Sequence, residues 1–260
     1  MAAEQDTTVV RSRRTSNPTR TLVCLGFCGG GTGPYHAWGD VVPPDVDLAA
    51  ICYPGRDGRF LEDFAQNWDE LANDATEAVL SAATEGPYVL FGHSMGGWMA
   101  FDVAVRIEKQ GGPVPEALVV SSANAPSRGL TVKDMFPDRR DTDEQLLTWM
   151  RTHGLMPEHV LQDPDLQEMA LELMRADIRV RDTFAYRPGD RVKTPLQVIT
   201  GENDDVIASD AGQQWKGLAL GDFRHDVLPG GHFYTPEIWR RLPVSIPALT
   251  APKTSRSEAR

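Results

Sequence analysis

Cysteines, positive charges and long apolar runs are scarce in this chain of 260 residues, and each scarcity excludes a class of protein. Its three cysteines, Cys24, Cys28 and Cys52, are an odd set that makes no disulfide framework. We therefore expect buried free thiols in a reducing cytoplasm. Cys24 and Cys28 lack the second ligand pair that a zinc site needs, so no metal is expected. No apolar run reaches the roughly 18 residues of a membrane span, so no membrane association is expected either.

The shortage of positive charge excludes a further class of partner. Lysine and arginine number 26 against 37 aspartates and glutamates, which gives a formal net charge of −11. Nucleic acids are bound by basic surfaces, so we expect no nucleic-acid partner. The hydrophobic content of 41% is sufficient for a sizeable core.

The chain has the organisation of one domain with polar ends. We expect a disordered leader over residues 1–20, a domain over residues 21–250 and a disordered tail over residues 251–260. Arg13 and Arg14 resemble the start of a twin-arginine signal. The apolar stretch that follows them is too short for a signal peptide, so the leader is not interpreted as one.

Short apolar runs alternate with helical patterns along the domain. One helix is expected within residues 61–80, where apolar residues recur at helical spacing. The sequence predicts strands at residues 21–27, 48–53, 88–91, 117–120, 196–200 and 222–228. This alternation predicts an α/β fold with a mostly parallel sheet and helices on both faces.

Residues 127–190 differ from the rest because they are charged, look helical and contain no clear strand. Thr142 and Gln145 have the spacing of a capping box, and Asp163-Pro164 is a typical helix start. We expect a helical insertion that covers the sheet edge and gates a substrate chamber as a lid. The alternative is an ordinary pair of helices that cover the sheet.

Residues 91–97 carry the strongest chemical signal of the chain. They contain Gly92-x-Ser94-x-Gly96 between an apolar run and a helix-compatible run, which is the context of a nucleophile elbow. Small neighbours let strand and helix approach closely around a serine in strained backbone geometry. Ser94 is therefore the candidate nucleophile. The alternative is a serine in a purely structural turn.

A serine hydroxyl needs a base, and the base needs an acid to orient it. Among the six histidines, His232 is the best candidate because it lies in a loop directly after a predicted strand. The loop after residues 196–200 offers Asp204 as the acid, with Asp205 and Glu202 as alternatives. Residues 119–124, which follow the preceding strand, contain no carboxylate and thus favour this later loop.

The oxyanion that forms during acyl transfer needs two N–H donors. The backbone of Met95, directly after the nucleophile, should supply one, and the glycine-rich loop around Phe27 and Cys28 should supply the other. That loop has neither a dinucleotide fingerprint nor a phosphate-loop ending. Cys28 is a weak rival nucleophile because no base follows it in a recognisable pattern.

Several motifs together resemble one family, the type II thioesterases, which are free-standing α/β-hydrolases that serve nonribosomal peptide and polyketide synthases. The resemblance covers about residues 21–240. The family usually has proline and then alanine in the first loop, where this chain has Gly26 and Cys28. The matching motifs are Leu22-Val-Cys-Leu-Gly-Phe-Cys-Gly-Gly30, Tyr53-Pro-Gly-Arg56 with Arg59, Gly92-His-Ser-Met-Gly96, Gly201-Glu-Asn-Asp204 and Gly230-Gly-His-Phe233.

The resemblance implies roles for these residues. Ser94, Asp204 and His232 would form the catalytic triad, Met95 and Cys28 would give the oxyanion N–H groups, and residues 127–190 would be the lid. The implied reaction is hydrolysis of acyl or aminoacyl thioesters on the phosphopantetheine arm of acyl or peptidyl carrier proteins. It needs no metal or soluble cofactor. We expect a cytoplasmic monomer.

Three rival functions remain open on the sequence alone. An esterase or lipase acting on free esters would use the same triad, as would an acyltransferase or cyclase. A non-catalytic carrier-binding protein on the same fold is the third. We also hypothesise a basic rim for docking an acidic carrier, against the alternative of an ordinary solvated surface. Its members would be Arg56, Arg59, Arg128, Lys133, Arg139 and Arg140.

Overall fold

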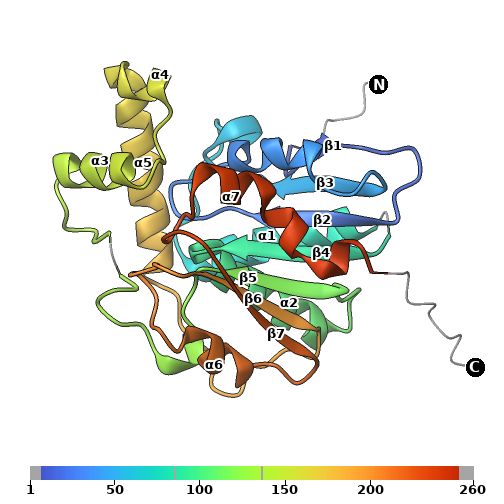
Figure 1. Ribbon diagram of the computed structural model, residues 1–260. Coiled ribbons are helices and arrows are strands. Elements are labelled where there is room, and N and C mark those ends of the chain that lie inside the picture. Colours follow the sequence, from blue (N-terminus) through green and yellow to red (C-terminus); the bar gives the residue numbers. More distant parts are fainter. Residues whose placement is uncertain (1–6, 85, 136, 252–260) are drawn as a thin grey trace, which may run out of the picture.

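A seven-stranded sheet forms the centre of the computed structural model, which describes residues 7–84, 86–135 and 137–251. The strands are ordered β1-β3-β2-β4-β5-β6-β7, and every neighbouring pair is parallel except β1 with β3 (Figure 1). The predicted α/β fold with a mostly parallel sheet is thus confirmed. The strands are β1 (Val9–Arg13), β2 (Arg20–Leu25), β3 (Val46–Ile51), β4 (Tyr88–His93), β5 (Ala117–Ser121), β6 (Leu196–Gly201) and β7 (Phe223–Leu228).

The central strands are buried on both faces, which explains why they read as continuous apolar runs. In β4, Tyr88 and Leu90 point to one core, and Val89 and Phe91 point to the other. The first core lies beneath α1 (Trp68–Ala83), α2 (Met95–Gln110) and α6 (Ala211–Lys216).

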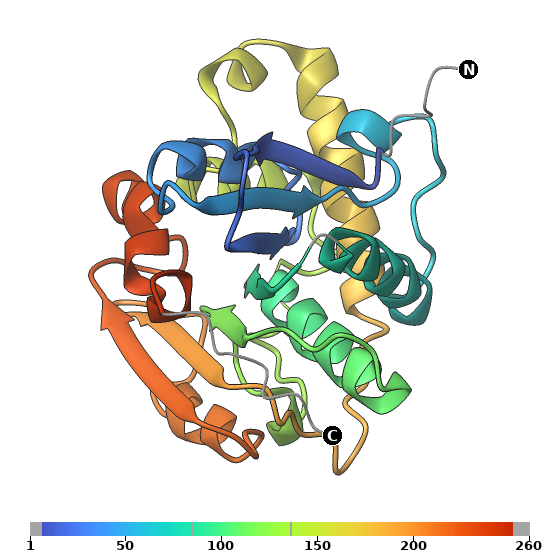
Figure 2. The ribbon, with the colours of Figure 1, turned by 90° about the vertical axis from the view of Figure 1, so that its right-hand side faces the viewer.

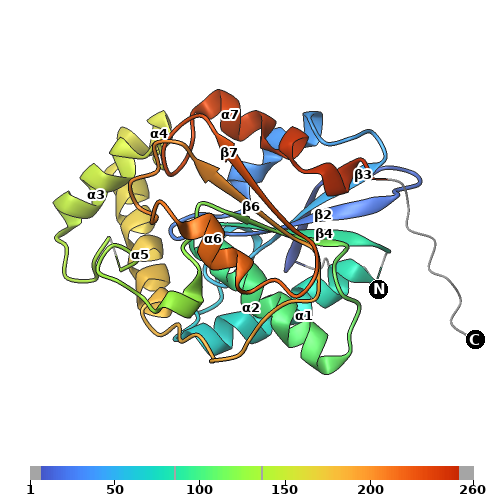
Figure 3. The same cartoon turned by 60° about the horizontal axis from the view of Figure 1, so that its bottom comes forward.

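The second core is covered by short helices. They are η1 (Gly33–Asp40), α7 (Pro236–Arg241), η4 (Leu242–Ser245) and η5 (Pro247–Leu249). Figures 2 and 3 show the two helical layers on opposite sides of the sheet. Each of these helices has a proline at its first or second position, and the prolines at the starts of α7, η4 and η5 break the end of the chain into short pieces.

The first strand was not anticipated, because residues 9–13 lie within the expected disordered leader. Val9 and Val10 pair with Ile51 and Ala50 of β3, and this antiparallel pairing covers an edge that would otherwise be open. Residues 1–6 and 252–260 lie outside the described residues, and they include the start of the predicted leader and most of the predicted tail.

The helix expected within residues 61–80 begins later than its apolar pattern suggests. The side chain of Asn67 accepts a hydrogen bond from the Glu70 N–H and caps α1 at Trp68. Leu61, which fits the apolar stripe, lies before this cap and is 95% exposed.

Residues 127–190 form a helical insertion that stands beside the sheet at the left of Figure 1. It contains η3 (Pro126–Arg128), α3 (Asp143–Thr152), α4 (Glu158–Leu161) and α5 (Pro164–Arg181). The predicted capping box is confirmed, since Thr142 and Gln145 bond reciprocally. Asp163 caps α5 as its sequence indicated.

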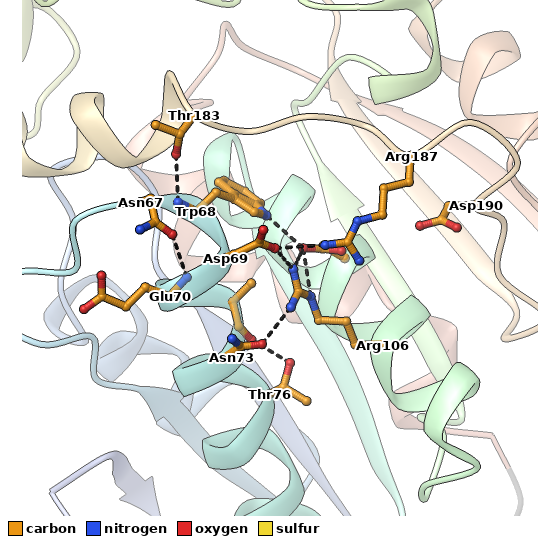
Figure 4. A network of polar contacts seen from close by, with 12 residues as sticks. Asn67, Trp68, Asp69, Glu70, Asn73, Thr76, Arg106, Thr183, Arg187 and Asp190 are labelled. Atoms are coloured by element: carbon orange, nitrogen blue, oxygen red, sulfur yellow. Dashed lines mark hydrogen bonds and ion pairs between the residues drawn. The ribbon is translucent and has the colours of Figure 1, made fainter.

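A network of polar contacts fixes the end of the insertion to the main domain (Figure 4). The Trp68 N–H donates to the hydroxyl of Thr183 at 2.8 Å, and Arg187 reaches Asp69 at 3.0 Å. Arg106 of α2 also contacts Asp69, so the return segment is tied to both α1 and α2. No helix among the described residues is both long and apolar enough to cross a membrane.

Candidate active site

Ser94 lies on the sharp turn that joins β4 to α2. Its φ of 54° and ψ of −123° are an unfavourable conformation for a residue with a side chain. A Cβ atom added to Gly92 would lie 1.8 Å from the Gly96 carbonyl oxygen, and one added to Gly96 would lie 2.6 Å from the Gly26 oxygen. The glycines of the motif are therefore required by the close approach of strand, helix and the neighbouring loop.

The structure brings together three side chains that are distant in the sequence. His232 Nε2 lies 2.9 Å from Ser94 Oγ. On the other side of the ring, His232 Nδ1 lies 3.1 and 3.2 Å from the two oxygens of Asp204. The candidate nucleophile, base and acid are thus within hydrogen-bond distance in the order that serine hydrolases use.

Asp204 is held in its charged form. Burial acts to raise the pKa of its carboxyl group, but hydrogen bonding to His232 and the charge of that residue lower it. The Val206 N–H and the Ser122 hydroxyl lower it further, so the pKa lies below its usual value. The alternatives, Glu202 and Asp205, are exposed residues on the same loop.

Ser122 is a site residue that sequence reasoning missed. It follows β5, the strand after which the sequence offers no carboxylate as an alternative acid. Its φ is 46°. Its hydroxyl supports Asp204 and lies 3.2 Å from the Tyr234 hydroxyl. The Ser121-Ser122 pair directly after a predicted strand was the only signal in the sequence.

Cys28 and Met95 line one cavity together with Ser94 and His232. Met95 is the first residue of α2, where backbone N–H groups have no partner within the helix. Among the described residues, no hydrogen bond of the Cys28 N–H is present. Both expected oxyanion donors therefore border the nucleophile. Burial raises the pKa of the Cys28 thiol to about 12, which disfavours Cys28 as a rival nucleophile.

The cavity, together with the open solvent at its mouth, measures about 520 Å³, and the insertion forms part of its boundary. Trp149 of α3 and Arg181 of α5 lie on its wall together with Trp98 of α2 and Phe233, the residue after His232. The helical insertion therefore forms one side of the chamber in front of Ser94.

His93, the residue before Ser94, lies buried among aromatic side chains. It is fully buried, and its ring packs against Phe27, Phe233 and Trp239. Burial and the nearby His232 lower its pKa well below the usual value, so His93 stays neutral. Its Nδ1 atom lies 3.1 Å from the Ser121 hydroxyl.

Two residues of the hypothesised basic rim are not on the surface. Arg56 and Arg59 are 6% and 7% exposed and form ion pairs with Asp177 and Asp74, respectively. A buried guanidinium requires such a partner, so these side chains point inward. Lys133, Arg139 and Arg140 are exposed, and Arg128 is half-buried and paired with a carboxylate.

The side chains of the described residues form no cluster suited to a metal ion. Among residues 7–84, 86–135 and 137–251, no group of three or more His, Cys, Asp or Glu side chains is placed to hold one.

Comparison with known proteins gives the family. The model of the thioesterase domain matches residues 20–243. Thioesterase PikA5 of Streptomyces venezuelae is 30% identical over 229 residues, which are 87% of this chain and 79% of that protein. A probable cadicidin biosynthesis thioesterase of Streptomyces griseus is 33% identical over 233 residues, which are 88% of this chain and 63% of the relative.

A solved structure agrees with these relatives. The type II thioesterase BorB from the borrelidin biosynthetic cluster superposes with a TM-score of 0.81 at 34% identity, and the match covers 94% of this chain and 97% of that one. The chain therefore belongs to the thioesterase domain family, as an α/β-hydrolase of the type II thioesterase kind.

Proposed function

We propose that this thioesterase hydrolyses acyl or aminoacyl thioesters on the phosphopantetheine arm of carrier proteins in nonribosomal peptide or polyketide biosynthesis. In the proposed reaction Ser94 is the nucleophile, His232 the general base and Asp204 its orienting acid. The observation that carries the proposal is the continuous contact from Ser94 through His232 to Asp204 at the wall of the cavity. The names of relatives from antibiotic pathways support the substrate class.

Acylation begins with the proton on Ser94 Oγ. The Asp204 carboxylate accepts a hydrogen bond from the His232 Nδ1–H, which leaves Nε2 free to take the serine proton. Oγ then attacks the thioester carbon, and the oxyanion accepts hydrogen bonds from the N–H groups of Met95 and Cys28. When the carbon–sulfur bond breaks, the imidazolium returns the proton to the phosphopantetheine sulfur.

Deacylation repeats these steps with water. His232 Nε2 takes a proton from the water as its oxygen attacks the acyl-Ser94 carbonyl. The same oxyanion donors act again, and collapse of the intermediate releases a carboxylic acid and restores the Ser94 hydroxyl. His232 relays the serine proton to the leaving sulfur and the water proton back to Ser94 Oγ, so the scheme uses no metal or soluble cofactor.

The insertion would act as the lid of this site. Trp149 and Arg181 already lie on the cavity wall, and a carrier-bound arm has to pass them to reach Ser94. The partners we propose are the acyl or peptidyl carrier domains of a synthase.

Mass spectrometry of acylated carrier proteins tests the proposal. The wild type should shift the carrier mass by loss of the acyl group and release a free acid. Ser94→Ala should reduce the rate by a factor on the order of 10⁴–10⁶, as removal of a triad serine does elsewhere. Ser209→Ala, which changes an exposed serine, is the matched control and should keep full activity.

The same experiment separates the rival functions. Faster turnover of a matched soluble ester than of the carrier thioester would favour an esterase, and a product bearing another nucleophile would favour an acyltransferase or cyclase. Retained hydrolysis by Ser94→Ala would contradict the proposed mechanism.

A further inference from the structure

A buried ion pair holds the loop that carries the Cys28 N–H. Asp177, near the C-terminal end of insertion helix α5, is 1% exposed, and Arg56, in the loop after β3, is 6% exposed. They pair in a bidentate manner, with Arg56 Nη2 to Asp177 Oδ1 at 2.6 Å and Arg56 Nη1 to Asp177 Oδ2 at 2.9 Å. The two residues come from parts of the chain that are 121 positions apart.

Both partners of this pair also bind the backbone next to Cys28. The Gly29 N–H donates to Asp177 Oδ2 at 2.8 Å, and Arg56 Nη1 donates to the Gly30 carbonyl oxygen at 2.8 Å. The pair therefore holds the peptide group between Cys28 and Gly29 and the peptide group that follows Gly30.

The loop itself is a tight turn that needs such support. The Gly30 N–H donates to the Phe27 carbonyl at 2.8 Å, and Gly29 has a φ of +73°, so Cys28 and Gly29 are the two central residues. The helix packs directly on this turn, because a Cβ atom on Gly29 would lie 2.4 Å from Met174 Cε of α5. The position of the Cys28 N–H thus depends on where α5 lies.

Stability alone is a weak explanation for this arrangement. Burying two charges costs desolvation energy, and a buried ion pair often adds little to the free energy of folding. What the pair does provide is geometry, because a bidentate contact has few allowed orientations. An oxyanion donor is effective only if it is already in place when charge develops.

We propose that Asp177 and Arg56 are positioning residues for the oxyanion donor at Cys28, through which the insertion sets the reactivity of Ser94. The inference rests on the proposed function of Ser94 and Cys28. Helix α5 also carries Arg181 on the cavity wall, so one helix both borders the chamber and contacts the loop. A displacement of α5 would break the hydrogen bond from the Gly29 N–H to Asp177 and move the Cys28 N–H away from the oxyanion position. The contacts among Ser94, His232 and Asp204 would remain.

The test uses Asp177→Asn in the full-length protein, with a short soluble acyl thioester as substrate and an alkyl boronic acid as a transition-state analogue. The boronate bonds to Ser94 and places an oxygen at the oxyanion position, so its inhibition constant reports this site without turnover. The asparagine side chain has one carbonyl oxygen, whereas the Asp177 carboxylate accepts hydrogen bonds from the Gly29 N–H and from both Nη groups of Arg56. We expect kcat to fall about 10- to 100-fold, since a displaced donor weakens transition-state binding. KM should change less than about threefold, and boronate binding should weaken in step with kcat.

The neighbouring ion pair supplies a matched control. Arg59 is also buried, lies three residues from Arg56 and bonds Asp74 in a bidentate manner, but contacts neither Gly29 nor Gly30. Asp74→Asn should leave kcat and boronate binding within about twofold of the wild type, even where thermal stability falls. Arg56→Lys, which keeps the charge but loses the fork, should be intermediate and replaces Asp177→Asn if that variant does not fold.

Three results would overturn the proposal. They are a lower kcat with unchanged boronate binding, an effect on KM alone, or equal losses in Asp74→Asn. Failure of the proposed function can be told apart from failure of this inference. If the wild type cleaves no thioester but binds the boronate in a Ser94-dependent way, boronate binding can still be compared among the variants.

Discussion

Hydroxyl and imidazole groups behind Ser94 connect the ends of three neighbouring strands. The Tyr234 hydroxyl lies 2.8 Å from the Ser121 Oγ and donates to the Ile199 carbonyl at 3.2 Å. Ser121 in turn contacts His93, and Ser122 supports Asp204. These contacts join the loop of Asp204 to the turn at Ser94, so the geometry of the proposed triad depends on residues that have no role in the proposed reaction.

The buried His93 should make stability depend on pH. Its pKa is lowered in the folded protein, whereas in the unfolded chain it should lie near the ordinary value of about 6.5. Below that pH the unfolded chain binds the additional proton, so the free energy of unfolding should fall as pH decreases, by up to about 1.4 kcal/mol per pH unit. Above it this contribution is constant.

Denaturant unfolding of wild type and His93→Gln between pH 5 and pH 8, roughly one and a half units either side of that value, measures the effect. The variant should lack this part of the slope. His36→Gln, which removes an exposed imidazole, controls for loss of a histidine as such. Parallel curves for wild type and His93→Gln would contradict the prediction.

The insertion illustrates how an element depends on its ends. Helix α3 has ten residues, of which only Leu146 and Met150 are buried, so packing contributes less to it than to α2. In its capping box, the Gln145 N–H donates to the Thr142 hydroxyl oxygen, and the Thr142 N–H donates to the Gln145 side-chain oxygen. Because α3 carries Trp149 on the cavity wall, fraying of this helix would also change the chamber.

Removing the cap should loosen α3 selectively. Thr142→Ala should cost about 1 kcal/mol of helix stability and speed hydrogen exchange of the α3 amides about fivefold. Thr148→Ala, at an exposed position inside the same helix, should do the opposite, because alanine is the better helix former. Equal exchange rates in the two variants would show that the cap contributes nothing.

Across the whole molecule, the proposed catalytic residues Ser94 and Asp204 follow inner strands, whereas unpaired backbone groups lie at the edges of the sheet. Strands β4 and β5, which lead to Ser94 and Ser122, are fully buried. At one end of the sheet, β1 pairs with β3 and shields its backbone groups. We therefore expect activity and solubility to depend on different strands.

Deletion of residues 1–14 should separate these two properties. It removes β1 and exposes the edge of β3, which invites pairing with other chains. We expect aggregation on heating and a lower melting temperature, while freshly purified monomer keeps its kcat. Deletion of residues 1–6, which retains β1, is the control for shortening the chain. Loss of kcat in monomer lacking residues 1–14 would refute this separation.

The parts of this protein that the sequence determined are those with a local physical cause. Glycines at fixed spacing around Ser94 predict the tight turn, because only small residues allow that approach of strand and helix. The capping box at Thr142 and the apolar runs of the central strands are local in the same sense. Each signal lies within a few residues of the structure it predicts.

Only the tertiary structure decided what depends on distant partners. Residues 9–13 become a strand because β3 offers them an edge. Arg56 points inward because it pairs with Asp177, which is 121 positions away in the sequence. In the same way His232 meets Asp204 rather than its exposed neighbours. Pairing and charge burial are interactions between segments, so no window of sequence contains both partners.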